Sequence, residues 1–119
     1  MHRALPIDPA TTICAIATPI GRGGLGVVRL SGPSSIDIAD RLFRTSAGIG
    51  LQKVAGYTVH YGRAHDLADN SPIDEVLVTV FRAPHSYSGE DMVEFSTHGG
   101  PVVMRRLLSV MIASGAHMA

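Results

Sequence analysis

The sequence predicts one α+β domain in which a mixed sheet and two helices follow the order ββαβββα. Three observations lead to this fold class. Short β-branched runs are separated by Gly and Pro, and two segments carry apolar residues at helical spacing. The 119 residues, of which 45% are hydrophobic and 17% charged, suit one compact core. The sequence shows no repeat of the kind that builds solenoids.

The first half of the chain predicts two strands and a helix. Residues 12–18 form a β-branched run that Pro19 closes, and residues 26–30 alternate again before the next Gly-Pro pair. Ser34 can cap a helix over residues 34–44, in which apolar side chains share one face. We therefore expect two neighbouring strands followed by a helix.

The second half predicts three strands. Residues 45–54 are polar and Gly-rich, which indicates a loop, and residues 56–63 alternate as a strand. Residues 75–81 are apolar at nearly every position, which predicts a central strand covered on both faces. Residues 92–97 form the fifth strand, with Glu94 at its middle.

A second helix closes the predicted domain. Gly99 and Gly100 precede Pro101, and proline suits the first helical position because no hydrogen bond is lost there. An apolar stripe follows, and Gly115 is expected to end the helix.

The charge balance and the cysteine content indicate which partners and which cellular compartment to expect. Ten basic and ten acidic residues cancel, so the basic footprint typical of nucleic-acid binding is missing. Cys14 is the single cysteine, and the N-terminal residues lack the apolar core of a signal peptide. No apolar run approaches the roughly 20 residues of a membrane span. We expect a cytoplasmic protein without a membrane partner.

Residues 21–26 match the pattern G-x-G-x-x-G, but their context argues against a dinucleotide site. That fingerprint requires a helix directly after the glycines, whereas strand-like residues follow here. The sequence also lacks the G-K-[ST] ending of a phosphate-binding P-loop. A tight turn packed against backbone and a loop that approaches a ligand both remain open readings.

A polar segment beside the fifth strand contains secondary candidates for ligand binding. Tyr87 could stack on a flat ring or simply cover the core. The N–H groups at Gly99 and Gly100 could hold an anion at the start of the last helix. Glu90 and Asp91 are expected to be solvated turn residues.

Arg29 and Glu94 are the main candidates because each is a charged residue within an apolar strand. Such charges are normally compensated. They either pair with each other or face a pocket and bind a ligand of mixed polarity. The sequence contains no cluster with metal-ligand spacing and no recognisable catalytic triad, so we expect neither a metal site nor a catalytic residue.

Four blocks of sequence resemble the signatures of the MnmE (TrmE) family of tRNA-modifying GTPases. They are residues 17–24, 28–32, 86–91 and 98–101, and they occur in the family's order. The resemblance runs from about residue 12 to residue 119. It implies that residues 1–119 are a single N-terminal domain of a larger GTPase, whose helical domain, G domain and cysteine motif have no counterpart in this sequence.

The resemblance implies a folate-binding domain. Its fold would be like half of the tetrahydrofolate-binding domain of aminomethyltransferases, and two copies would pair into a homodimer. The expected ligand is 5-formyltetrahydrofolate or a related one-carbon folate. Arg29 and Glu94 match the family's ligand contacts, and a family lysine that also touches folate lies beyond the motifs found here. A purely structural dimerisation module without a ligand is the alternative.

The resemblance also implies what the whole family protein does. It acts with the flavoprotein MnmG on the wobble uridine of tRNA and adds a 5-carboxymethylaminomethyl-type group. GTP, K⁺ and Mg²⁺ belong to the G domain of that protein, so we expect no GTPase site and no catalysis from this domain alone.

Overall fold

The computed structural model describes residues 10–17, 26–86 and 89–119. Within these residues one sheet has the strand order β3-β4-β5-β6-β2-β1-β7. The strands are β1 (Ile13–Ile16), β2 (Gly26–Ser31), β3 (Phe43–Thr45), β4 (Thr58–His65), β5 (Pro72–Phe81), β6 (Met92–Thr97) and β7 (His117–Met118). Neighbouring strands run antiparallel except β1 and β7, which are parallel. The predicted α+β class with a mixed sheet is confirmed.

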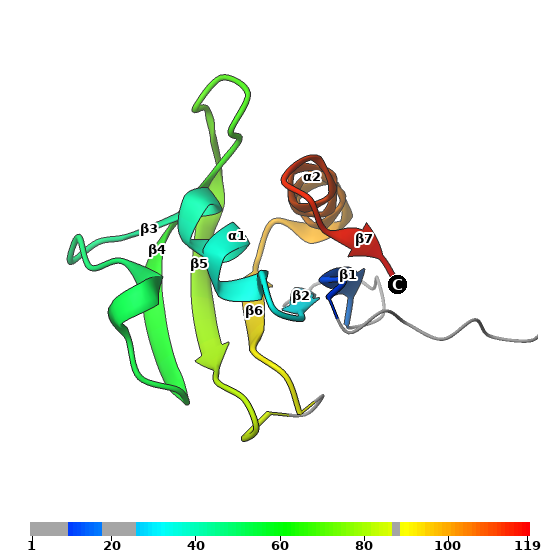
Figure 1. Ribbon diagram of the computed structural model, residues 1–119. Helices are drawn as coiled ribbons and strands as arrows, with labels where there is room; N and C mark the ends of the chain where they lie inside the picture. Colours follow the sequence, from blue (N-terminus) through cyan, green and yellow to red (C-terminus); the bar gives the residue numbers. More distant parts are fainter. Residues whose placement is uncertain (1–9, 18–25, 87–88) are drawn as a thin grey trace, which may run out of the picture.

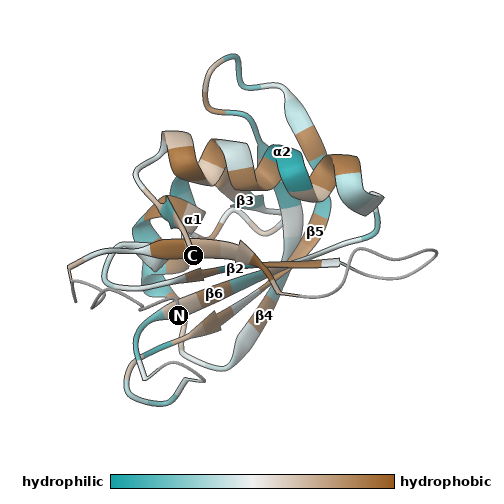
Figure 2. Cartoon of the chain, turned by 90° about the vertical axis from the view of Figure 1, so that its right-hand side faces the viewer, coloured by the Kyte–Doolittle hydropathy of each residue, from teal (hydrophilic) through white to brown (hydrophobic). Residues whose placement is uncertain are grey.

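Two helices cover one face of the sheet. They are α1 (Ser35–Leu42) and α2 (Gly100–Ala113), and a short 3₁₀ turn, η1 (Leu51–Lys53), follows β3. Both helices lie on the same side of the strands (Figure 1), and the part of the chain that the structure describes places no helix on the other side (Figure 2). We call this second side the open face. None of the described helices is long and apolar enough to cross a membrane.

The core lies between the helices and the sheet because alternate strand residues point to this side. Val28 and Leu30 of β2 and Val93 and Phe95 of β6 are fully buried there, as the alternation predicted. Each such side chain contributes about 1.5–3 kcal/mol by leaving water. The remaining buried apolar residues include Ile36, Ile38, Leu42, Phe43, Val76, Val78, Val80, Leu107 and Met111.

The end of the first helix differs from the prediction. α1 ends at Leu42, and Phe43 already belongs to the edge strand β3, which extends into the predicted loop. Ser34 occupies the N-cap position, but its side chain makes no capping hydrogen bond. Its backbone N–H instead donates to Oγ1 of Thr12 at 2.8 Å. A three-residue strand is too short to show an alternation in sequence.

The prediction that the apolar fourth strand is covered on both faces was wrong. β5 is an interior strand and begins earlier than expected, at Pro72. Val76, Val78 and Val80 are buried under the helices, but Leu77 on the open face is 41% exposed. The second apolar face of this strand is therefore uncovered by the described residues of the chain.

The second helix follows the prediction. It begins at Gly100, has Pro101 in its first turn, and is followed by Gly115 at a φ of +113°. β7 comes directly after and was not predicted, because two residues carry no periodicity.

Candidate functional site

The open face can be described as rows of side chains that run across the sheet. Residues directly opposite each other in antiparallel strands point to the same side. The register aligns Ala15, Arg29, Glu94, Thr79 and Val59 in one row, from β1 through β2, β6 and β5 to β4. We call this the central row. Both sequence-predicted charges therefore lie side by side on the open face.

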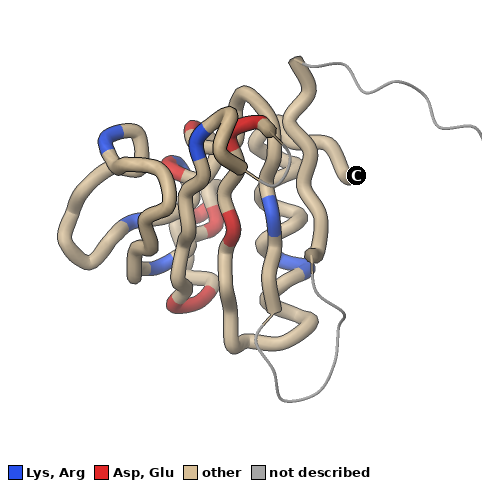
Figure 3. The backbone as a smooth tube through the Cα atoms, turned by 90° about the horizontal axis from the view of Figure 1, so that it is seen from below, with Lys and Arg blue, Asp and Glu red and all other residues tan. Residues whose placement is uncertain are grey.

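Arg29 and Glu94 form an ion pair at the middle of this row. Nε of Arg29 donates to Oε2 of Glu94 at 2.8 Å, and Nη2 of the same guanidinium donates to the same oxygen. Figure 3 shows a basic and an acidic position next to each other on neighbouring strands. The side chains keep 32% and 21% of their surface exposed. Within the described residues Oε1 of Glu94 accepts no hydrogen bond.

The pairing is one of the two arrangements that the sequence left open. A guanidinium and a carboxylate drawn partly out of water compensate each other by charge and hydrogen bonding. The pair is nevertheless at the surface of the open face, where a ligand could reach both groups. Its neighbours across the row, Ala15 and Thr79, are uncharged.

A small cavity lies beside the pair, on the side of β1. Its volume is about 250 Å³. The residues that line it are Ile13, Cys14, Ala15, Arg29, Ser31, Met92 and Ala119. Cys14 is opposite Leu30 in the register, so its thiol points to the helix-covered side, where burial raises its pKa. Arg29 thus borders a mainly apolar hollow.

The connection between β5 and β6 is held by its acidic residues. Ser31 donates its hydroxyl to Oε2 of Glu90 at 3.3 Å, and Oδ1 of Asp91 accepts the N–H of Ala83 at 2.8 Å. Glu90 and Asp91 are partly exposed in this connection, as expected, and each also binds a neighbouring group. Tyr87, in the same connection, lies outside the described residues.

Gly99 and Gly100 are not brought to the ion pair. They start α2, which packs on the helix-covered face, whereas Arg29 and Glu94 lie on the open face. A Cβ atom at residue 99 would lie 3.0 Å from Oδ2 of Asp74. A carboxylate of the chain itself therefore stands at the helix start, where the dipole favours negative charge. A ligand role of the two glycines stays a prediction.

The sequence did not reveal how apolar the open face is. Four large side chains on β4, β5 and the turn before β4 are substantially exposed there: Tyr57 65%, Val59 58%, Tyr61 51% and Leu77 41%. The alternation of residues 57–61 placed three of them on one side, but the pattern alone did not tell which side the helices would cover.

The chain matches a known family over the whole region just described. A family model described as "GTP-binding protein TrmE N-terminus" matches residues 12–119. The chain belongs to this TrmE N-terminal family. The match includes both members of the ion pair and all of the described strands.

Three relatives carry the same name. The chain is 50% identical over 116 residues, 97% of its length, to the tRNA modification GTPase MnmE of Chlorobaculum tepidum. It is 46% identical to the protein of that name from Carboxydothermus hydrogenoformans and 45% identical to the one from Geobacillus kaustophilus, over 91% of its length in each case. It covers 24%, 23% and 23% of these three proteins, so it spans about a quarter of their length.

Proposed function

We propose that this chain is the folate-binding and homodimerisation domain of a GTPase that modifies the wobble uridine of tRNA. The ligand would be 5-formyltetrahydrofolate or a related one-carbon tetrahydrofolate. GTP hydrolysis with K⁺ and Mg²⁺, and contacts with the flavoprotein MnmG and with tRNA, would belong to the full-length protein. The cytoplasm would be its compartment, in keeping with the buried free thiol of Cys14.

The observation that carries the proposal is the Arg29–Glu94 pair on the open face. A pterin has a flat ring whose edge presents adjacent N–H donors and a carbonyl oxygen. Oε1 of Glu94 is an acceptor that Arg29 does not use, and a guanidinium suits carbonyl or carboxylate oxygens. The pair therefore offers both polarities that such an edge requires.

The surroundings of the pair also suit a flat ligand. The cavity of about 250 Å³ next to Arg29 has mainly apolar walls, and Thr79 and Val59 extend the central row as an uncharged surface. Ligand sites commonly combine apolar walls with a few polar groups that fix orientation. The ring of the folate would lie against the uncharged sheet surface with its tail in the cavity, or the ring would fill the cavity and the tail would lie along the sheet.

The apolar part of the open face supports homodimerisation. Tyr57, Val59, Tyr61 and Leu77 form a patch rich in aromatic side chains, which are enriched at protein interfaces. A second copy placed on this patch would cover the strand surface that the described chain leaves uncovered. It would also bring a second polypeptide close to the ion pair.

The fact that Arg29 and Glu94 pair with each other favours one alternative: a structural dimerisation module without a ligand. Calorimetric titration of the chain with 5-formyltetrahydrofolate separates this alternative from a folate-binding domain. We expect saturable heat that Arg29→Ala and Glu94→Ala abolish, while the control Arg105→Ala, on the exposed side of α2, leaves it unchanged. A dimer that gives no heat, in this chain and in the full-length protein, would establish the alternative.

A further inference from the structure

Thr79 lies directly opposite Glu94 in the central row, on the side away from Arg29. Side chains directly opposite each other in an antiparallel pair have Cβ atoms about 4.5–5.5 Å apart. Thr79 is half-buried, and within the residues that the structure describes its hydroxyl takes part in no hydrogen bond. The row therefore presents a guanidinium, a carboxylate and a hydroxyl in that order, each one strand away from the next.

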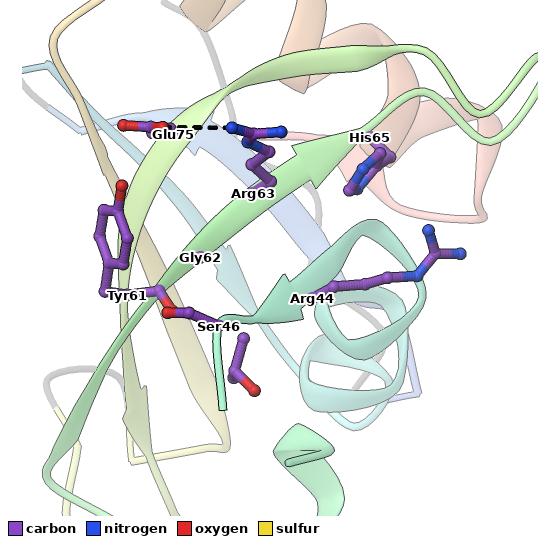
Figure 4. A pocket seen from close by; sticks show the side chains of 8 residues that line it. Arg44, Ser46, Tyr61, Gly62, Arg63, His65 and Glu75 are labelled. Atoms are coloured by element: carbon purple, nitrogen blue, oxygen red, sulfur yellow. Dashed lines mark hydrogen bonds and ion pairs between the residues drawn. The ribbon is translucent and has the colours of Figure 1, made fainter. Parts of the chain in front are cut away.

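The charged side chains at the β3 end of the open face are bound to partners of their own. Figure 4 shows Arg63 paired with Glu75, with Nη2 of Arg63 3.4 Å from Oε1 of Glu75, while Arg44 extends away from both. Nη1 of Arg44 donates to Oδ1 of Asn70 at 3.1 Å. Oε1 of Glu94 differs, because it accepts no hydrogen bond from the described residues. A ligand would therefore find an open acceptor in the central row, beside the hydroxyl just described.

We propose that Thr79 is a specificity-determining residue of the folate site, and that its hydroxyl donates to ring nitrogen N1 of the pterin. This inference rests on the proposed function. The edge of a tetrahydropterin presents, in order, the acceptor O4, the donors N3–H and 2-NH₂, and the acceptor N1. Arg29 donates to the first, Oε1 of Glu94 accepts from the donors, and the Thr79 hydroxyl donates to the last. The order of hydrogen-bonding groups along the central row is thus complementary to the order along the ring edge.

The same order determines which way the ring points. In a pterin N5 lies next to O4, and N8 lies next to N1. With O4 at Arg29, N5 and the one-carbon group that it carries face β1, where the cavity of about 250 Å³ lies. The tail leaves the ring at C6, beside N5, and therefore starts on this side too. Ala15, which follows Arg29 in the row and lines the cavity, would contact the one-carbon group.

The test is calorimetric titration of the unmodified chain, Thr79→Val and Thr79→Ser with 5-formyltetrahydrofolate. Valine has nearly the shape of threonine but no hydroxyl, so Thr79→Val should weaken binding about five- to tenfold, as expected for one lost hydrogen bond. Thr79→Ser keeps the hydroxyl and should bind within about twofold of the unmodified chain. Thr97→Val is the matched control and should not change the affinity. Oγ1 of Thr97 also lacks a hydrogen bond within the described residues, but it is fully buried on the helix-covered face.

Changed ligands identify the atoms that the row contacts. An analogue with carbon in place of N1 should bind the unmodified chain about as weakly as 5-formyltetrahydrofolate binds Thr79→Val, and Thr79→Val should not weaken it further. Ala15→Val narrows the cavity beside Arg29. It should weaken binding of 5-formyltetrahydrofolate at least about threefold more than binding of tetrahydrofolate, which carries no group on N5.

Equal affinities of the unmodified chain and Thr79→Val would overturn the role of Thr79 and leave folate binding in place. A loss in Thr79→Ser or Thr97→Val as large as the loss in Thr79→Val would overturn it as well. A further loss when Thr79→Val meets the analogue without N1 would overturn the assignment to that atom, and equal weakening of both folates by Ala15→Val would overturn the orientation. No binding to the unmodified chain or to the full-length protein would instead refute the proposed function, and this inference with it.

Discussion

The backbone carbonyl of Arg44 lies against Gly62, so that a Cβ atom at residue 62 would be 2.1 Å from its oxygen. The edge strand β3 can approach β4 this closely only because residue 62 has no side chain. We predict that Gly62→Ala lowers the free energy of unfolding by about 1–3 kcal/mol, since the obstacle is backbone and cannot rotate away. Urea denaturation measures this loss.

Gly50→Ala is the matched control. A Cβ atom there would lie 3.4 Å from Oδ1 of Asp40, an ordinary contact, and the residue has a φ of −71° that alanine adopts readily. Its free energy of unfolding should stay the same or rise by less than about 1 kcal/mol. Equal losses in Gly50→Ala and Gly62→Ala would contradict the close approach of β3.

The Arg29–Glu94 pair is predicted to contribute little to stability. Both side chains are partly exposed, so a double-mutant cycle of Arg29→Ala and Glu94→Ala should give a coupling energy of about 1 kcal/mol or less. The variants should remain folded by circular dichroism. A loss of about 3–5 kcal/mol in Glu94→Gln would instead indicate a pair that is retained to hold the fold together.

The fold was predictable where apolar residues repeat over five or more positions. The bounds of β6 and the buried sides of β2 and β6 follow from strict alternation, and Pro101 with Gly115 marks both ends of α2. β3 and β7 were missed because two or three residues show no period, and they form only through pairing with β4 and β1.

The candidate site was only partly predictable. Two isolated charges in apolar strands pointed to Arg29 and Glu94, but their direct pairing depends on the register of β2 and β6, which are distant in sequence. The neighbouring positions of Arg44 and Arg63 gave no signal, since Arg44 lay in the predicted helix and Arg63 at the end of a predicted strand. Only the pairing of β3 with β4 brings these two arginines together.

Arg82 is predicted to hold the η1 turn against the sheet. Its Nε and Nη2 donate to the carbonyl of Val54 at 2.9 and 2.8 Å, and Nη2 also reaches the carbonyls of Leu51 and Gln52, both at 3.2 Å. Arg82→Lys keeps the charge but loses the planar fork. We expect it to cost about 1.5–3 kcal/mol of unfolding free energy.

Hydrogen exchange locates this effect. The amide protons of Lys53 and Val54, which donate to Gly50 and Leu51, should exchange faster in Arg82→Lys than in the unmodified chain. Arg105→Lys changes an exposed arginine of α2 and should alter neither exchange nor stability by more than about 0.5 kcal/mol. Unchanged exchange at both amides in Arg82→Lys would show that the hydrogen bonds of the Arg82 guanidinium are not needed to hold η1 in place.

We predict that the buried thiol of Cys14 makes the folded chain less stable at alkaline pH. The thiol is fully buried, and burial raises its pKa above the ordinary value of 9.0. Above pH 9 the unfolded chain releases this proton while the folded chain retains it, so unfolding becomes easier by up to about 1.4 kcal/mol per pH unit. Below pH 9 both states keep the proton and the contribution is constant.

The comparison with Cys14→Ala isolates this contribution from the other groups that titrate. We expect the difference in unfolding free energy between the two proteins to be constant from pH 6 to pH 8 and to shrink above pH 9, measured by urea denaturation at each pH. A difference that stays constant up to pH 10.5 would mean that the thiol ionises equally in both states.

Val59→Lys is predicted to separate the proposed dimer without unfolding the monomer. Val59 is 58% exposed at the end of the central row, so a lysine there can remain hydrated in the monomer but would be buried against an apolar surface in the dimer. Val102→Lys is the control, because Val102 is 70% exposed on α2, on the opposite side of the sheet. Sedimentation velocity at tens of micromolar should show a dimer for the unmodified chain and Val102→Lys and a monomer for Val59→Lys. Dissociation by Val102→Lys alone would move the interface to the helical side, and a monomeric unmodified chain would refute self-association through this domain.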